Sequence, residues 1–157
     1  MIVRKGRKGD LKEVFELVRE LAIYENGLHE VNNSPEAMEK DGFGPDPVFE
    51  FLVAENDRGI IGLSLYYYRY STWKGKQLYL EDLIVTEKYR RSGAGTLLME
   101  ATIKEAKARN CNGIQWQVLH WNEPAIKFYE RYNPLQDAEW VNFRIEKDQL
   151  NNYNSSS

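Results

Sequence analysis

Cysteine, histidine and long apolar runs are scarce in these 157 residues, and each scarcity excludes a class of protein. Cys111 is the single cysteine, which excludes an intrachain disulfide and a cysteine-rich metal site. His29 and His120 have no second ligand at metal-binding spacing, so we expect no metal. No apolar run approaches the roughly 18 residues of a membrane span. Residues 2–4 show no signal-peptide pattern, and we therefore expect a cytoplasmic protein without a membrane partner.

Positive charge is not in excess either. The 21 Lys and Arg residues face 24 Asp and Glu residues, and the formal net charge is −3. This balance does not favour nucleic-acid binding, and it is compatible with a small cationic substrate. A hydrophobic content of 42% with 29% charged residues is typical of a globular domain. We predict a single domain over residues 1–150, followed by a polar tail at 151–157 that we expect to be disordered.

The most informative stretch runs from residue 79 to residue 99. Its first part, to Val85, is apolar and aromatic apart from Glu81 and Asp82, which predicts a half-buried strand. From Thr96 onward the residues are strong helix formers. The intervening Arg90-Arg91-Ser92-Gly93-Ala94-Gly95 combines two cations with two glycines at a helix start, where unpaired backbone N–H groups carry partial positive charge. This arrangement predicts a site for a phosphate or pyrophosphate, although a glycine pair before a helix is, taken alone, as often simply a tight turn.

Two common phosphate-binding loops do not fit this stretch. A Walker-type loop needs a Lys directly after its last glycine, and Thr96 follows Gly95. A dinucleotide fingerprint needs a third glycine where Leu98 stands. The remaining pattern, Arg-x-x-Gly-x-Gly between a strand and a helix, resembles the acetyl-coenzyme A loop of the GCN5-related N-acetyltransferase (GNAT) family. The resemblance implies acetyl-coenzyme A as cosubstrate.

The order of predicted elements is typical of a mixed α/β fold. A strand at 2–4 precedes a helix that Asp10 caps with Glu13 as a capping-box partner, and Ser34-Pro35 opens a second helix. The remaining strands are expected at 49–55, 60–70, 78–85, 114–119 and 140–145, and the remaining helices at 96–109 and 122–132. This order predicts an antiparallel meander and one β-α-β crossover. It also matches the GNAT fold, a mostly antiparallel mixed sheet with a central β-α-β unit and flanking helices, over nearly the whole chain.

A second segment, Trp121 to Tyr129, is similar to the other coenzyme segment of the family. The resemblance implies that Asn122 hydrogen-bonds the coenzyme and that Tyr129 donates a proton to the departing thiolate. A phenol with pKa near 10 can protonate a thiolate whose conjugate acid has pKa near 8.5. On its residues alone, Phe128-Tyr129 is better explained as the buried face of a short helix. The coenzyme contacts implied in all are Leu83, Ile84, Val85, Arg90, Arg91, Ser92, Gly93, Ala94, Gly95, Thr96, Asn122, Lys127 and Tyr129.

The acceptor side resembles the diamine (spermidine/spermine) branch of the family, and the Ser71-to-Gly75 run looks most like its thialysine-acetylating members. By this resemblance Tyr24, Glu25, Trp73, Glu81 and Asp82 line the amine site, with Glu81 as a catalytic base. Carboxylates and aromatic faces suit ammonium groups. Taken alone, Glu81 and Asp82 could instead form a salt bridge or a solvent-facing strand end, and Trp73 could simply pack.

The resemblance implies acetyl transfer to a small polyamine or lysine-like amine by direct attack in a ternary complex. It also implies a homodimer with the C-terminal strands at its interface. Two alternatives remain open from the sequence: an acetyltransferase acting on protein or peptide amines, and a non-catalytic coenzyme A-binding module.

Overall fold

The computed structural model describes residues 1–154, which form two compact units, Met1–Gln117 and a second unit from Val118 onward. The first unit is built on a five-stranded sheet in the order β1-β2-β3-β4-β5. Its strands are β1 (Ile2–Lys5), β2 (Glu50–Asn56), β3 (Gly59–Ser71), β4 (Gly75–Val85) and β5 (Ile114–Gln115). Strands β1 to β4 are antiparallel, and β5 runs parallel to β4. The predicted mixed α/β fold is thereby confirmed.

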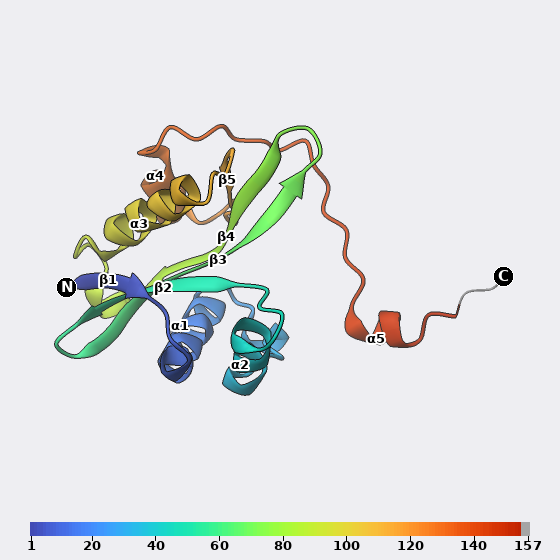
Figure 1. Ribbon diagram of the computed structural model, residues 1–157, viewed down its shortest axis with the longest axis horizontal. Coiled ribbons are helices and arrows are strands. Elements are labelled where there is room, and N and C mark those ends of the chain that lie inside the picture. Colours follow the sequence, from blue (N-terminus) through green and yellow to red (C-terminus); the bar gives the residue numbers. More distant parts are fainter. Residues whose placement is uncertain (155–157) are drawn as a thin grey trace. The chain divides into compact units, whose positions relative to one another are not determined.

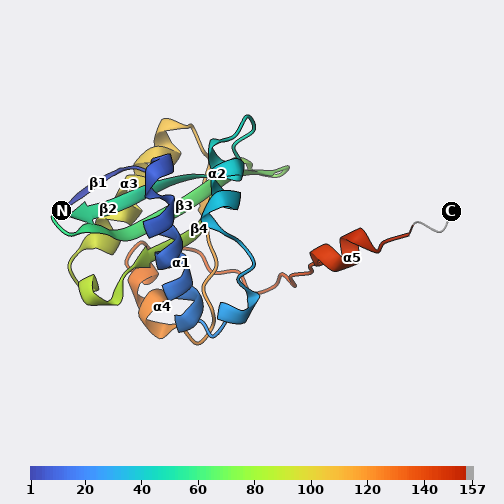
Figure 2. The same cartoon turned by 90° about the horizontal axis from the view of Figure 1, so that it is seen from below.

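Helices cover both faces of this sheet (Figure 1). Helices α1 (Leu11–Tyr24) and α2 (Pro35–Phe43) lie on one face, and α3 (Ala94–Ala108) lies on the other, as the turned view also shows (Figure 2). The short 3₁₀ turns are Lys8–Asp10, Leu28–Glu30 and Glu87–Tyr89. The order β4-α3-β5 forms the predicted β-α-β crossover, with α3 connecting two parallel strands.

The two faces differ in how they are packed. Under α1 and α2 the core is apolar, with Val14, Leu63 and Ile84 at its centre. Under α3 the sheet lies close to the helix, since a Cβ added to Gly62 would come within 2.9 Å of Leu98 Cδ1. A buried pair of hydroxyls, Ser64 Oγ and Thr102 Oγ1 at 2.6 Å, crosses this second interface. From Gly62 to Tyr68, the strand alternation of β3 therefore sends odd-numbered side chains to the α1 face and even-numbered ones to the α3 face, whereas Ile60, beyond the register shift at Ile61, packs on the α1 side.

The predicted N-cap of α2 is confirmed, and the predicted capping box of α1 is wrong. Ser34 Oγ accepts the N–H of Ala37, with Pro35 in the first turn. Asp10 does precede α1, but its carboxylate accepts from Arg4 and from the N–H of Arg7 instead of capping the helix. Glu13 is not a capping-box partner, because it accepts the N–H of Ile60. Both carboxylates accept from donors outside the helix instead.

The second unit contains α4 (Glu123–Glu130) and the short α5 (Lys147–Asn151). Two predicted strands need correction. Strand β5 ends at Gln115 rather than at 119, and residues 140–145 form no strand within the described part of the chain. The alternating apolar pattern of 140–145 suggested a strand, but a strand requires a neighbouring ladder to satisfy its backbone, and none pairs with it there. Its apolar side chains are exposed, Phe143 to 93%.

The predicted tail is also shorter than expected. Asn151 belongs to α5, and only residues 152–154 of the predicted tail are described without helical structure. Residues 155–157 lie outside the described residues.

Candidate active site

The predicted anion loop connects β4 to α3 and has the backbone conformation that its glycines suggested. Gly93 is the N-cap of α3 with φ 89°, and Arg91 has φ 64°, so two left-handed residues turn the chain into the helix. A side chain at Gly93 would meet no atom within 4 Å, which leaves open space over the first turn of α3. The first N–H groups of a helix lack intrahelical acceptors and carry partial positive charge. Their geometry here fits an anionic group.

The two arginines of the loop have different surroundings. Arg90 lies over the Tyr24 ring at 5.3 Å, and its Nε donates to Val85 O at 3.3 Å. Its guanidinium is therefore held between α1 and the end of β4. Arg91 is exposed. Of the two, Arg91 is the cation better placed to approach an anion from solvent.

One edge of β4 is available for a further extended chain. The ladder with β5 contains only Leu78–Ile114 and Tyr79–Gln115, so the strand beyond residue 79 has no partner on that side within residues 1–154. The bond from Thr86 N–H to Ile61 O fixes the alternation of this part of the ladder with β3. It follows that the N–H and C=O groups of Leu83 and Val85 point to the free edge.

Ile84 differs from its neighbours, because its N–H and C=O groups pair with β3 at Leu63. The predicted contact of coenzyme with this edge is therefore a contact with residues 83 and 85. The side chain of Ile84 is buried in the apolar core on the α1 side of the sheet.

The acidic pair in β4 is explained by a β-bulge. Leu65 pairs with Asp82 and Tyr66 pairs with Leu80, which leaves Glu81 as an extra residue in β4. A bulge interrupts strand alternation, so both carboxylates turn to the α1 face of the sheet. Glu81 Oε2 accepts the Tyr67 hydroxyl proton at 2.9 Å on that face. The sequence showed two adjacent charges in an apolar strand, but it carried no signal for the bulge.

Burial and charge crowding set the protonation of this cluster. Burial, together with the nearby Glu81 and Glu25 carboxylates, raises the pKa of Asp82 to about 7. Burial also raises the pKa of Glu25, at the C-terminal end of α1. Tyr67 has its pKa raised by burial and by its bond to Glu81, so it stays a hydroxyl donor. Three carboxylates thus lie close together here, which suits an ammonium ligand.

The other two predicted acceptor residues occupy different places. Tyr24 contacts Arg90 at the loop side of α1. Trp73 is 87% exposed at the tip of the β3–β4 hairpin. At about 3.3 Å per residue, the strand between Gly75 and Glu81 alone spans roughly 20 Å. The structure thus brings Glu25, Glu81 and Asp82 together and leaves Trp73 remote from them within the same chain.

In the second unit, α4 starts after the predicted cap Asn122 but ends at Glu130, two residues before the predicted end. Asn122 Oδ1 accepts the N–H of Ala125 at 3.3 Å, as an N-cap does. Phe128 and Tyr129 form an edge-to-face pair at 5.2 Å, and Tyr129 is half-buried while Lys127 is exposed. Asn133, with φ 50°, takes the left-handed conformation that often follows a helix.

Residues 1–154 hold no group of three His, Cys, Asp or Glu side chains placed to bind a metal ion. None of the helices in this part of the chain combines the length and apolar character needed to cross a membrane.

Comparison with known proteins identifies the family and the fold. A model of the Acetyltransferase (GNAT) family matches residues 12–133. The chain is 36% identical to a thialysine N-epsilon-acetyltransferase of Mus musculus, covering 94% of each. It is 33% identical to a human spermidine/spermine N(1)-acetyltransferase-like protein, over 94% of this chain and 23% of that one. The solved structure of a Bacillus halodurans protein, a tetramutant, superposes with a TM-score of 0.75 at 26% identity, covering 92% of this chain and all (100%) of the other.

Proposed function

Because the chain belongs to the acetyltransferase (GNAT) family, whose members use acetyl-coenzyme A, we propose that this N-acetyltransferase acetylates a small cationic amine from that donor. The acceptor would be a polyamine or a lysine-like amino acid such as thialysine. The observation that carries the proposal is the bulge in β4, which turns Glu81 and Asp82 to the same face as Glu25. Relatives named for thialysine and spermidine/spermine acetylation support the same class of acceptor.

The residues present fit the donor. The open space at Gly93, the helix start behind it and the exposed Arg91 suit a pyrophosphate. The free β4 edge at Leu83 and Val85 suits an amide-containing pantetheine arm, which could add to the sheet as a short strand. We assign Ser92, Ala94, Gly95 and Thr96 to the same anion site, and Asn122 and Lys127 to the coenzyme from the second unit. Acetyl-coenzyme A would supply the acetyl group as a thioester.

The acceptor needs a base. An amine pKa near 10.4 lies about 3.4 units above pH 7, so deprotonating the ammonium group at pH 7 costs about 4.6 kcal/mol. General bases work best with a pKa near the working pH. Asp82, with a pKa of about 7, matches that requirement, and Glu81 lies beside it. We therefore propose that the Glu81–Asp82 pair receives the ammonium proton, directly or through water.

The transfer itself is a direct attack. The neutral amine nitrogen forms a bond to the thioester carbonyl carbon, and the carbon–sulfur bond breaks to release the thiolate. Tyr129 would donate its hydroxyl proton to that thiolate, so the products are the acetamide and coenzyme A. No covalent enzyme intermediate is needed, and Cys111 has no assigned part in the reaction.

Trp73 and Tyr24 complete the proposal. Since Trp73 stands roughly 20 Å from Glu81 in its own chain, it would serve the amine site of a second copy in a homodimer. Tyr24, under Arg90, would border the amine site from the loop side.

The test is acetyl transfer by variants of the proposed acid and base. Tyr129→Phe should lower kcat at least tenfold while coenzyme binding is retained. Asp82→Asn and Glu81→Gln should each lower kcat/KM for the amine, with Asp57→Asn, at an exposed turn, as the matched control. Normal turnover in Tyr129→Phe would refute its role as the acid. Unchanged amine kinetics in both carboxylate variants would refute the acceptor site.

A further inference from the structure

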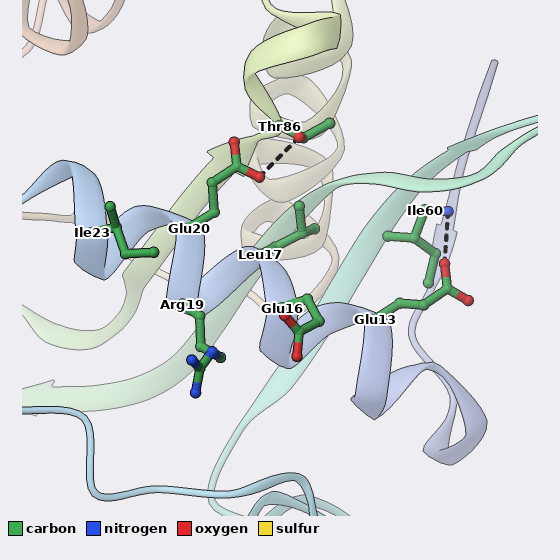
Figure 3. Close-up of a pocket in the computed structure, with 8 residues that line it drawn as sticks. All are labelled: Glu13, Glu16, Leu17, Arg19, Glu20, Ile23, Ile60 and Thr86. Carbon is green, nitrogen blue, oxygen red and sulfur yellow. Dashed lines mark hydrogen bonds between the residues drawn. The ribbon is translucent and has the colours of Figure 1, made fainter. Parts of the chain in front are cut away.

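Glu20, in the last turns of α1, binds the start of the β4–α3 loop at Thr86 and Glu87, which we call the loop entrance. Its two carboxylate oxygens accept separate hydrogen bonds, one from Thr86 Oγ1 and one from the N–H of Glu87, both at 2.8 Å. Figure 3 shows Glu20 reaching from the helix to Thr86. Its Oε1 also lies 3.9 Å from Arg90 Nη2. Thr86, Glu87 and Arg90 therefore all meet one side chain that lies far away in the sequence.

The loop beyond this point depends on its entrance for its geometry. After the 3₁₀ turn at Glu87–Tyr89, the chain passes through the left-handed Arg91 and Gly93 into α3. Convergent N–H groups bind an anion well only when they are already arranged before the ligand arrives. The carboxylate of Glu20 fixes the Thr86 side chain and the Glu87 backbone N–H, with which the loop begins.

Electrostatics alone would disfavour an acidic residue here. A carboxylate beside the entrance of an anion site repels the ligand, so on charge alone its removal should tighten anion binding. The two hydrogen bonds act in the opposite direction, because they order the loop. These opposed effects allow one measurement to decide which of them dominates.

We propose that Glu20 is a positioning residue for the donor: it preorganises the β4–α3 loop by binding Thr86 and Glu87. The inference rests on the proposed function, because it takes the loop to be the coenzyme site. Glu20 touches neither reacting group and acts through the loop.

The test is Glu20→Gln, with Glu16→Gln as matched control. Gln keeps the size of the side chain, but its NH₂ group replaces one of the two acceptor oxygens. Glu16 lies one turn earlier on α1 and lines the same groove without a hydrogen bond or ion pair among the described residues (Figure 3). We expect Glu20→Gln to raise KM for the donor and Kd for coenzyme A by about tenfold, with kcat within about twofold. Glu16→Gln should change neither constant.

Thr86→Val removes the donor side of the same contact without changing its shape. It should weaken coenzyme A binding too, and the double variant should lose less than the product of the two single effects. Hydrogen exchange of residues 86–92 in the free enzyme should become faster in both single variants. Tighter coenzyme A binding by Glu20→Gln would overturn the proposal, as would additive effects in the double variant.

Arg91→Glu separates this inference from the proposed function. If Arg91→Glu and Gly93→Val leave coenzyme A binding unchanged, the loop is not the donor site and the assignment of the site fails. If both weaken binding while Glu20→Gln and Thr86→Val do not, only the positioning role fails.

Discussion

Asp82→Asn should stabilise the protein at alkaline pH and leave its stability nearly unchanged in acid. Burial and the Glu81 and Glu25 carboxylates raise the pKa of Asp82 from 3.8 to about 7 in the folded protein. A raised carboxyl pKa means that the folded state holds this proton after the unfolded chain has released it. The resulting penalty on folding is absent below pH 3.8, grows between pH 3.8 and 7, and is complete above pH 7.

The size of the effect follows from the shift. Each pKa unit corresponds to about 1.4 kcal/mol, so the shift from 3.8 to about 7 gives a full penalty of about 4.5 kcal/mol, of which about 2.5 kcal/mol is gained between pH 5 and pH 8. Asparagine has nearly the shape of aspartate and does not titrate. The free energy of unfolding of Asp82→Asn relative to wild type should therefore rise by about that amount over this interval.

Urea unfolding at pH 5, 6, 7 and 8 measures this difference directly, provided that the m-value is the same for both proteins. Asp57→Asn is the control, because Asp57 is exposed in the β2–β3 turn and its difference from wild type should stay flat. If the difference in unfolding free energy between Asp82→Asn and wild type does not grow with pH, Asp82 does not have a raised pKa in the folded protein. The kinetic counterpart is kcat/KM for the amine, which should rise in wild type with an apparent pKa near 7 and lose that step in Asp82→Asn.

Three further predictions concern single ion pairs and side-chain hydrogen bonds. Arg4 forms ion pairs with Asp10 and Glu55, both at 2.8 Å, and its hydrogen bonds hold the Asp10 pKa below its usual value, so this contribution is present at neutral pH and disappears in acid. Arg4→Met should cost about 1–3 kcal/mol at pH 7 in urea unfolding and less at pH 3, and an equal cost at both would contradict the pairing. Thr102→Val leaves the buried Ser64 hydroxyl without its partner and should cost about 1–3 kcal/mol, with Ser64→Ala recovering part of that loss in the double variant. Tyr67→Phe removes the donor to Glu81 and should raise the amine KM by severalfold while donor binding is unchanged; equal losses for both substrates would point to general misfolding instead.

The parts of the fold that depend on local signals could be predicted from the sequence. Ser34-Pro35 marks the start of α2, and the glycine pair with its arginines marks the loop before α3, because caps and left-handed turns need particular residues at fixed offsets. The antiparallel meander followed from strand periodicity and turn residues.

Features that depend on distant partners could not be predicted in this way. The bulge at Glu81 is a matter of register between β3 and β4, and neither strand alone encodes which residue is skipped. Glu20 and Thr86 are 66 residues apart, and nothing in α1 distinguishes Glu20 from Glu16. The prediction of a strand at 140–145 was wrong, because alternating apolar residues form a strand only where a neighbouring strand pairs with their backbone. The surroundings of Arg90, which lies over the Tyr24 ring and donates to Val85 O, likewise depend on partners outside the loop motif.

The most direct test of the account is thiol release from acetyl-coenzyme A in the presence of spermidine, putrescine, thialysine, lysine and a lysine peptide, with wild type and Asp82→Asn side by side. We predict clear turnover on at least one free amine, much less on the peptide, and loss of the step near pH 7 in the variant. Tight coenzyme A binding with no turnover on any free amine, or turnover on the peptide alone, would contradict the assignment of the carboxylate cluster as a small-amine site.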